Sequence, residues 1–127
     1  MPVSYFIDHE KKRLYTKATG SVTFIDLREH MRSEFGRSTA AYSELFDCTE
    51  ATAELDADDM RTLVKERSQI AQVQNAAPVA IVAPADKFYD LFKIFDSLTS
   101  SIRPIAIFRE TSEAEYWLDK LSENDKS

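Results

Sequence analysis

The stretch Phe46-Asp47-Cys48-Thr49, followed after five residues by Leu55-Asp56-Ala57-Asp58-Asp59, decides the fold of this chain. It predicts a buried strand, a polar loop and the start of a helix. That arrangement places Thr49, Asp56, Ala57 and Asp58 at the carboxyl end of a sheet. Because α/β domains usually bind ligands at that edge, the stretch is the first candidate site for a ligand or a partner.

The rest of the chain repeats the change from strand pattern to helix pattern. Thr23 and Asp26 form a capping box, Gly20 is expected to end the strand before it, and Ser112 with Glu115 forms a further box. The apolar run at 78–83 predicts a central strand that is covered on both faces. The expected strands are 3–8, 13–19, 42–47, 78–83 and 103–108, and the expected helices are 23–36, 56–75, 85–100 and 112–121.

This order predicts a single α/β domain, with a mixed, mostly parallel five-stranded sheet and four helices. The domain is expected over residues 3–121, and residues 122–127 are expected to form a disordered C-terminal tail. A chain of 127 residues fits the usual size of one domain.

Composition excludes several classes of function. The net charge of −6 argues against nucleic-acid binding, which needs a basic face. Two glycines are too few for a phosphate-binding loop, and a single cysteine excludes an internal disulfide. His9 and His30 are far apart and are expected to be solvated, so we expect neither a metal site nor a cofactor. The sequence shows no signal peptide or transmembrane segment, and we expect a cytoplasmic protein.

Two groups of residues have the chemistry of catalysis, and each also has a structural interpretation. Asp56, Asp58 and Asp59 could act as acids or bases or bind a hard metal ion, but carboxylates in a first helical turn also cap the helix and complement its dipole. Cys48 could be a nucleophile, but a lone cysteine at the end of a buried strand is usually a small core residue.

The helix expected at 85–100 has an unusually wide apolar face. Its residues Phe88, Tyr89, Leu91, Phe92, Ile94, Phe95 and Leu98 cover more than one side. This pattern fits a partner surface or a ligand groove, and it equally fits a helix buried over the sheet. A groove between the second and third helices would be lined by residues such as Met60, Val64, Phe88 and Phe92.

Dispersed motifs resemble the bacterial SpoIIAA-like (STAS/SEC14) family. They are Ala18-Thr19-Gly20, Leu45 to Thr49, Pro78 to Val82, and Ile107-Phe108 with Glu113 to Leu118. In STAS anti-sigma-factor antagonists, a serine at the start of a helix is phosphorylated by a partner kinase. The matching position here is Ala57, which has no hydroxyl, and three carboxylates surround it. The resemblance implies the fold and a binding role, without the phosphoserine switch.

The leading functional hypothesis is therefore a non-enzymatic regulatory or protein-interaction module of STAS type, forming a homodimer through its apolar helices. Its candidate surface is Thr49, Asp56, Ala57, Asp58, Met60, Val64, Phe88, Tyr89, Phe92 and Ile94. An alternative is a carrier or sensor of a small apolar or lipid-like ligand, bound between the second and third helices. A third hypothesis is a hydrolase that uses Cys48.

Overall fold

A computed structural model describes residues 2–35, 42–70, 77–99 and 104–125 of the chain. Within these residues, one five-stranded sheet and four helices confirm the predicted α/β domain. The elements are β1 (Val3–Asp8), β2 (Arg13–Thr23), α1 (Phe24–Phe35), β3 (Ser43–Glu54), α2 (Ala57–Ile70), β4 (Val79–Val82), α3 (Asp86–Thr99), β5 (Ile105–Phe108) and α4 (Thr111–Asp125). The expected helix ends at Gly36 and Asn75 and the expected strand start at Arg103 lie outside the described residues.

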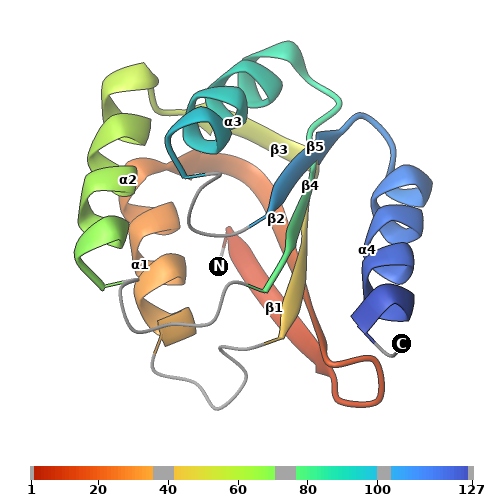
Figure 1. The fold of residues 1–127 in the computed structure, drawn as a ribbon. Coiled ribbons are helices and arrows are strands. Elements are labelled where there is room, and N and C mark those ends of the chain that lie inside the picture. The colour runs from red at the N-terminus through yellow and green to blue at the C-terminus, as the bar shows by residue number, and fades with distance from the viewer. Residues whose placement is uncertain (1, 36–41, 71–76, 100–103, 126–127) are drawn as a thin grey trace.

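The strands lie in the order β1-β2-β3-β4-β5, so each strand neighbours the next one in the chain. The β1–β2 pair is antiparallel, and all later pairs are parallel. Three connections join neighbouring parallel strands: β2-α1-β3, β3-α2-β4 and β4-α3-β5. Each advances across the sheet in the same direction. Because such connections are right-handed, their helices lie on the same face of the sheet. Figure 1 shows this result: α1, α2 and α3 cover one face, and α4 covers the other.

Strands β2 and β3 are longer than predicted. β2 does not end at Gly20, because this residue adopts a positive φ of 67° and the pairing register shifts between Lys17 and Thr19. The strand thus bends and continues to Thr23. The polar loop expected after Thr49 is also wrong, since β3 runs to Glu54 and pairs with the second half of β2. Buried Ala51 and Ala53 alternate with exposed polar residues there, which is a strand pattern.

The apolar strand β4 lies in the interior of the sheet, between β3 and β5, and all four of its residues are buried. β3 takes the middle position. Val79 and Ile81 face the larger core under α1, α2 and α3, whereas Ala80 and Val82 face the smaller core under α4. This strand is covered on both faces, as its unbroken apolar run predicted.

Two of the predicted helix starts are confirmed. The Asp26 amide donates to Thr23 Oγ1 at 3.3 Å and the Thr23 amide donates to Asp26 Oδ2 at 2.9 Å. Asp56 and Asp59 make the same reciprocal pair at 2.9 and 3.0 Å. These bonds satisfy amides that the first turn of a helix leaves without partners.

Helix α4 differs from its prediction at both ends. It begins at Thr111 and continues to Asp125, so residues 122–125 are helical although they were assigned to the tail. Glu115, expected in a capping box with Ser112, forms an ion pair with Arg13 instead. Residues 126–127 lie outside the described residues.

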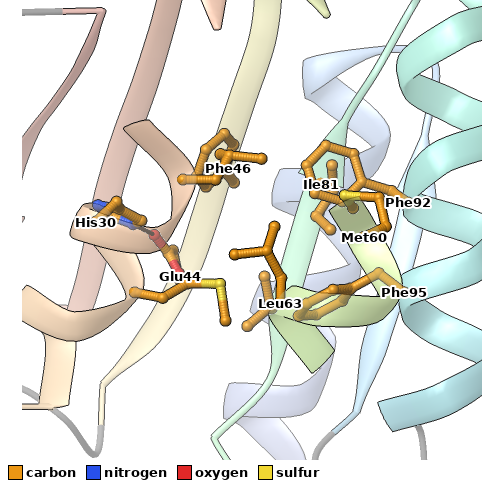
Figure 2. Close-up of a pocket in the computed structure, with 11 residues that line it drawn as sticks. His30, Glu44, Phe46, Met60, Leu63, Ile81, Phe92 and Phe95 are labelled. Atoms are coloured by element: carbon orange, nitrogen blue, oxygen red, sulfur yellow. Dashed lines mark hydrogen bonds and ion pairs between the residues drawn. The ribbon is translucent and has the colours of Figure 1, made fainter. Parts of the chain in front are cut away.

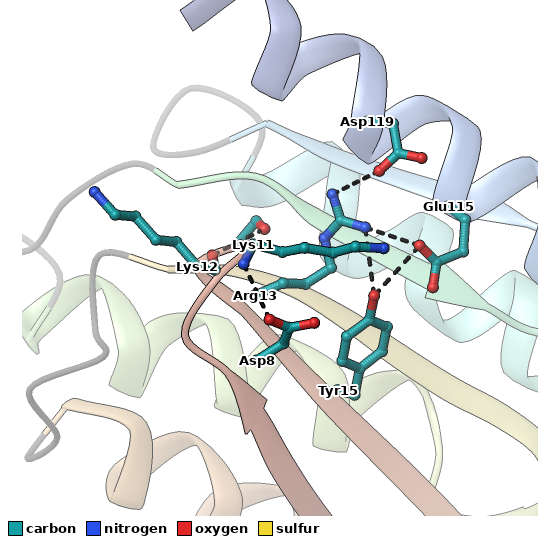
Figure 3. A network of polar contacts seen from close by, with 8 residues as sticks. Asp8, Lys11, Lys12, Arg13, Tyr15, Glu115 and Asp119 are labelled. Carbon is teal, nitrogen blue, oxygen red and sulfur yellow. Dashed lines mark hydrogen bonds and ion pairs between the residues drawn. The ribbon is translucent and has the colours of Figure 1, made fainter. Parts of the chain in front are cut away.

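Arg13, at the start of β2, is a buried charged residue, with only 2% of its side chain exposed. Its guanidinium donates to Glu115 Oε2 at 2.8 Å and to Asp119 Oδ1 at 3.0 Å, both on α4 (Figure 3). Burial acts to lower the pKa of Arg13, but hydrogen bonds to Tyr15 and Asp119 outweigh it and the pKa is raised. Arg13 therefore stays positively charged and connects β2 to α4 through its two ion pairs.

Candidate functional site

The predicted site at the carboxyl edge of the sheet is a solvated surface. Thr49 is exposed on β3, and its amide donates to Asp47 Oδ1 at 2.8 Å. Ala57 is half-buried in the first turn of α2, directly after the capping residue Asp56. Asp58 is exposed and pairs with Arg61 at 2.6 Å. The capping interpretation accounts for this acidic cluster, because its hydrogen bonds lie within its own helix.

The apolar stripe of α3 is directed into the domain. Phe88, Leu91, Phe92 and Phe95 are buried, and the Phe88 and Phe92 rings stack at 5.7 Å between centroids. Leu98, which belongs to the wide apolar face predicted for this helix, is 49% exposed. The stripe therefore buries most of its apolar area against the domain's own sheet and helix α2.

Tyr89 and Ile94, which lie off the stripe, are half-buried and pack against the larger core. The Arg109 guanidinium lies 3.9 Å from the centroid of the Tyr89 ring. Arg109 also donates to the Pro84 carbonyl and to Asp86, both at 2.8 Å. This contact joins the end of β5 to the start of α3, so the domain itself covers part of Tyr89.

Cys48 is a core residue, with 1% of its surface exposed. Burial raises the pKa of its thiol, and the nearby carboxylates Asp47 and Glu44 add to the effect. Since the thiolate is the nucleophilic form, the structure removes the chemical basis for a hydrolase that uses Cys48.

We expect the Cys48 thiol to react with Ellman's reagent at pH 8 at least about 100-fold more slowly in the folded protein than in denaturant, because both burial and a raised pKa suppress the thiolate. The double variant Cys48→Ala/Thr49→Cys is a matched control, since it moves the thiol one position along β3 to an exposed site. A folded wild type that reacts as fast as this variant would contradict the expectation.

A pocket of about 40 Å³ lies between the sheet and the three helices that cover it. Nine apolar side chains and two polar ones, His30 and Glu44, line it. The apolar residues are Leu27 and Met31 of α1, Phe46 of β3, Met60 and Leu63 of α2, Val79 and Ile81 of β4, and Phe92 and Phe95 of α3. Figure 2 shows His30 and Glu44 together at one side, with Met60, Phe92 and Phe95 at the other.

The polar side of this pocket is built from three elements. His30 Nε2 lies 2.9 Å from Glu44 Oε2, and Thr16 Oγ1 of β2 donates to the same oxygen at 2.6 Å. The side chains of His30 and Glu44 are only 5% and 4% exposed. The imidazole also packs edge-on against Phe46, at 5.4 Å between ring centroids. His30 and Glu44 thus form a fixed polar pair within an apolar wall.

The structure brings together only part of the predicted site. Met60 and Phe92 line the pocket, but Val64 and Phe88 are core residues that do not. The pocket also lies away from the predicted edge, because Glu44 and Val79 are at the amino ends of β3 and β4. Thr49, Asp56 and Asp58 therefore belong to a different region of the molecule.

His30 and Glu44 are the polar pocket residues that sequence reasoning missed. His30 was expected to be solvated, but it is 8% exposed. The sequence did contain a sign that His30 faces inward, since His30 follows Leu27 by three positions and so shares its helix face. Glu44 precedes Phe46 by two positions and therefore shares its face of β3. The periodicity marks both as inward-facing, although it does not show that they meet.

Two further properties concern only the part of the chain that the structure describes. It contains no group of three or more histidine, cysteine, aspartate or glutamate residues placed to hold a metal ion. None of its helices is both long enough and apolar enough to span a membrane.

No protein-family model matches this sequence, and no curated protein matches it significantly. Solved structures do match. One is an uncharacterized protein of the DUF3478 family with a SpoIIAA-like fold, from Shewanella loihica PV-4, with 22% identity, coverage of 91% of this chain and 93% of that one, and a TM-score of 0.57. This chain has the SpoIIAA-like fold.

Two anti-sigma factor antagonists share the SpoIIAA-like fold with it. SpoIIAA in its unphosphorylated form is 11% identical over 94% of this chain and 96% of its own, with a TM-score of 0.56. An antagonist from Mycobacterium paratuberculosis is 8% identical over 92% and 94%, with a TM-score of 0.54. The predicted SpoIIAA-like architecture is therefore confirmed, and at these identities the likeness concerns the fold.

Proposed function

We propose that this chain is a non-enzymatic protein-interaction module of STAS type that works without a phosphoserine switch. The observation that supports the proposal is the start of helix α2 at Ala57, a residue without a hydroxyl that the family resemblance matches to the phosphoacceptor serine. Asp56 and Asp59 are used there as reciprocal caps, and Asp58 is exposed to solvent. The likeness in fold to two anti-sigma factor antagonists supports a regulatory role.

The surface around Asp58 is the proposed contact, and a charge reversal tests it. Asp58→Lys should abolish co-purification of a protein partner from the native host. Glu123→Lys is the matched control, because Asp58 and Glu123 are both exposed acids paired with a basic residue three positions away. Equal loss in both variants, or no partner with the wild type, would contradict the proposal.

We expect Ala57→Ser to leave this site unphosphorylated in host extract with ATP. The added hydroxyl would lie beside Asp58 and Asp59, and a phosphate would be repelled by both carboxylates. Intact-mass measurement after incubation checks this, with the wild type as the control for phosphorylation elsewhere. Stoichiometric phosphorylation together with altered partner affinity would show that a switch needs only the hydroxyl.

The homodimer through the apolar helices stays a proposal, and Leu98 is the sharper probe of it. Ile94 packs against the core, so a charge there would also disturb folding, whereas Leu98 is 49% exposed on α3. Leu98→Asp should weaken self-association about tenfold in analytical ultracentrifugation, because it adds a charge to an apolar contact. Tyr116→Asp on α4 is the control on the opposite face of the sheet, and a larger effect there would place the interface on that face.

The pocket favours a second function, a carrier or sensor of a small apolar ligand. The proposal differs from the expected groove between α2 and α3, because α1 and the sheet also contribute to the wall. A pocket of this volume has room for a few waters, so a ligand with a hydrocarbon chain would require the helices to move apart. Native mass spectrometry of the freshly purified protein tests this function, since it reports a co-purified ligand and the oligomeric state together.

A further inference from the structure

The face of the sheet under α4 is only partly covered within the described residues. α4 packs on Leu45, Ala80 and Val82 of β3 and β4, and its Trp117 lies against Phe108 of β5. Neighbouring strands lie about 4.8 Å apart, so five strands span about 20 Å, whereas a helix is about 10 Å wide. One helix over β3 to β5 therefore leaves space for a second helix over β1 and β2, at the edge of the sheet (Figure 1).

Two stacked aromatic side chains lie on this open part of the face. Phe6 of β1 and Tyr15 of β2 are opposite each other in the hairpin, and their rings stack at 4.9 Å between centroids. Tyr15 packs against the small core under α4, but Phe6 is 63% exposed. Lys17 follows Tyr15 by two positions and shares its face. These three residues form the β1–β2 strip, whose aromatic area is available to a partner.

Carboxylates border the β1–β2 strip on two sides. On α4, Glu115 and Asp119 pair with Arg13. On β3, Glu50 pairs with Lys17. The side chains of Asp119 and Glu50 remain 53% and 60% exposed, so both can still meet a partner that covers the strip.

Acids outnumber bases around the strip. Asp8 follows Phe6 by two positions and Asp47 follows Leu45 by two positions, so both share the face that α4 covers. Five described carboxylates therefore lie on or beside the strip: Asp8, Asp47, Glu50, Glu115 and Asp119. Even when the adjoining hairpin turn is counted, three described cations accompany them: Lys11, Arg13 and Lys17. This excess favours a positively charged partner.

We propose that the β1–β2 strip docks a single amphipathic helix of a partner protein, with its apolar stripe against Phe6 and Tyr15 and with Lys or Arg on its flanks. The six residues of β1 span about 20 Å, which is the length of about 14 helical residues. This surface lies on the opposite side of the sheet from Asp58 of α2, so the inference goes beyond the contact proposed there and does not depend on it.

A second copy of the chain fits the strip less well. An area about 20 Å long and 10 Å wide is far below the roughly 800 Å² that each partner buries in a stable complex of standard size. A two-fold contact would also bring the same excess of carboxylates together from both copies, and like charges across an interface oppose association.

Three labelled peptides of about 14 residues test the chemistry of the partner. The first contains leucine, alanine and lysine, with the leucines at helical spacing so that they form one stripe. The second has glutamate in place of lysine, and the third has the composition of the first in scrambled order. Fluorescence anisotropy gives the dissociation constants. We expect the first peptide to bind at least about tenfold more tightly than either of the others.

Two pairs of variants locate the binding. Phe6→Ala should weaken it at least about fivefold, whereas Tyr116→Ala should not, although Tyr116 is 65% exposed on α4. Glu50→Lys should weaken it similarly. Glu123→Lys is its control, because both glutamates pair with a lysine, are 60% and 67% exposed, and give the same change in net charge. Glu50→Lys also keeps the test decisive if Phe6→Ala unfolds the protein.

Several results would overturn the proposal. Failure of the lysine peptide to bind, or equal binding of the scrambled peptide, would show that the strip does not recognise an amphipathic helix. Equal weakening by Glu50→Lys and Glu123→Lys would mean that net charge alone attracts the peptide. If no peptide binds and Phe6→Ala dissociates a wild-type dimer in analytical ultracentrifugation, the strip is an interface between two copies of the chain.

Discussion

Glu44→Ala should lower the free energy of unfolding by about 3 kcal/mol and the Tm by about 10 °C. Glu44 Oε2 is the common partner of His30 at 2.9 Å and of Thr16 at 2.6 Å. Alanine removes this shared acceptor and leaves an imidazole and a hydroxyl without it in a nearly dry environment. Removing one partner of a buried pair is costly for this reason. Urea unfolding followed by circular dichroism measures the loss.

Two comparisons show whether the buried pair causes the loss. Glu50→Ala changes an exposed glutamate of the same strand and should cost little, because its ion pair with Lys17 is solvated. A double-mutant cycle with His30→Leu should show coupling, since each single variant already breaks the same contact. A cost below about 1 kcal/mol for Glu44→Ala, or additive effects in the cycle, would mean that the pair does not hold α1 to the sheet.

Two of the helix starts and the element order could be predicted because local signals determine them. A capping box joins residues three positions apart, so Thr23–Asp26 and Asp56–Asp59 are visible in the sequence alone. The alternation of strand and helix patterns then leaves few topologies, because parallel crossovers are right-handed. Both arguments need no knowledge of contacts between distant residues.

Strand length and the position of the pocket could not be predicted in the same way. Gly20 was expected to end the strand, but with its positive φ it bends β2 and lets the pairing with β3 continue. The candidate site was placed at the carboxyl edge from a general rule for α/β sheets. The pocket depends instead on how three helices meet above the sheet, and no single segment encodes that packing.

Buried polar residues were the other source of error. Arg13, His30 and Glu44 were assigned to exposed positions or left out because charged residues are rarely buried. Each is buried because its partner comes from another element: Glu115 and Asp119 for Arg13, and each other for His30 and Glu44. Periodicity shows the face on which a residue lies, but it does not identify the distant residue that neutralises it.

Arg13→Ala should lower the free energy of unfolding by about 2.5 kcal/mol, through lost contacts between β2 and α4. The guanidinium makes charge-assisted hydrogen bonds to Glu115 and Asp119 and a longer one to the Tyr15 hydroxyl, and the stem of the side chain is buried. The side chains of Glu115 and Asp119 are 31% and 53% exposed, so water replaces part of the hydrogen bonding that they lose. The loss of stability should therefore be smaller than for a fully buried pair. Chemical denaturation measures it.

Hydrogen exchange should then show where stability is lost. α4 is the only helix on its face of the described structure, and its apolar contacts are limited to the small cluster around Ala114 and Leu118. If Arg13 holds α4 against the sheet, the amides of α4 should exchange faster in Arg13→Ala, while those of α1 keep their protection. Lys120→Ala, on the exposed side of α4, should change the amide exchange rates of neither helix. A uniform loss of protection would instead assign Arg13 to the stability of the whole sheet.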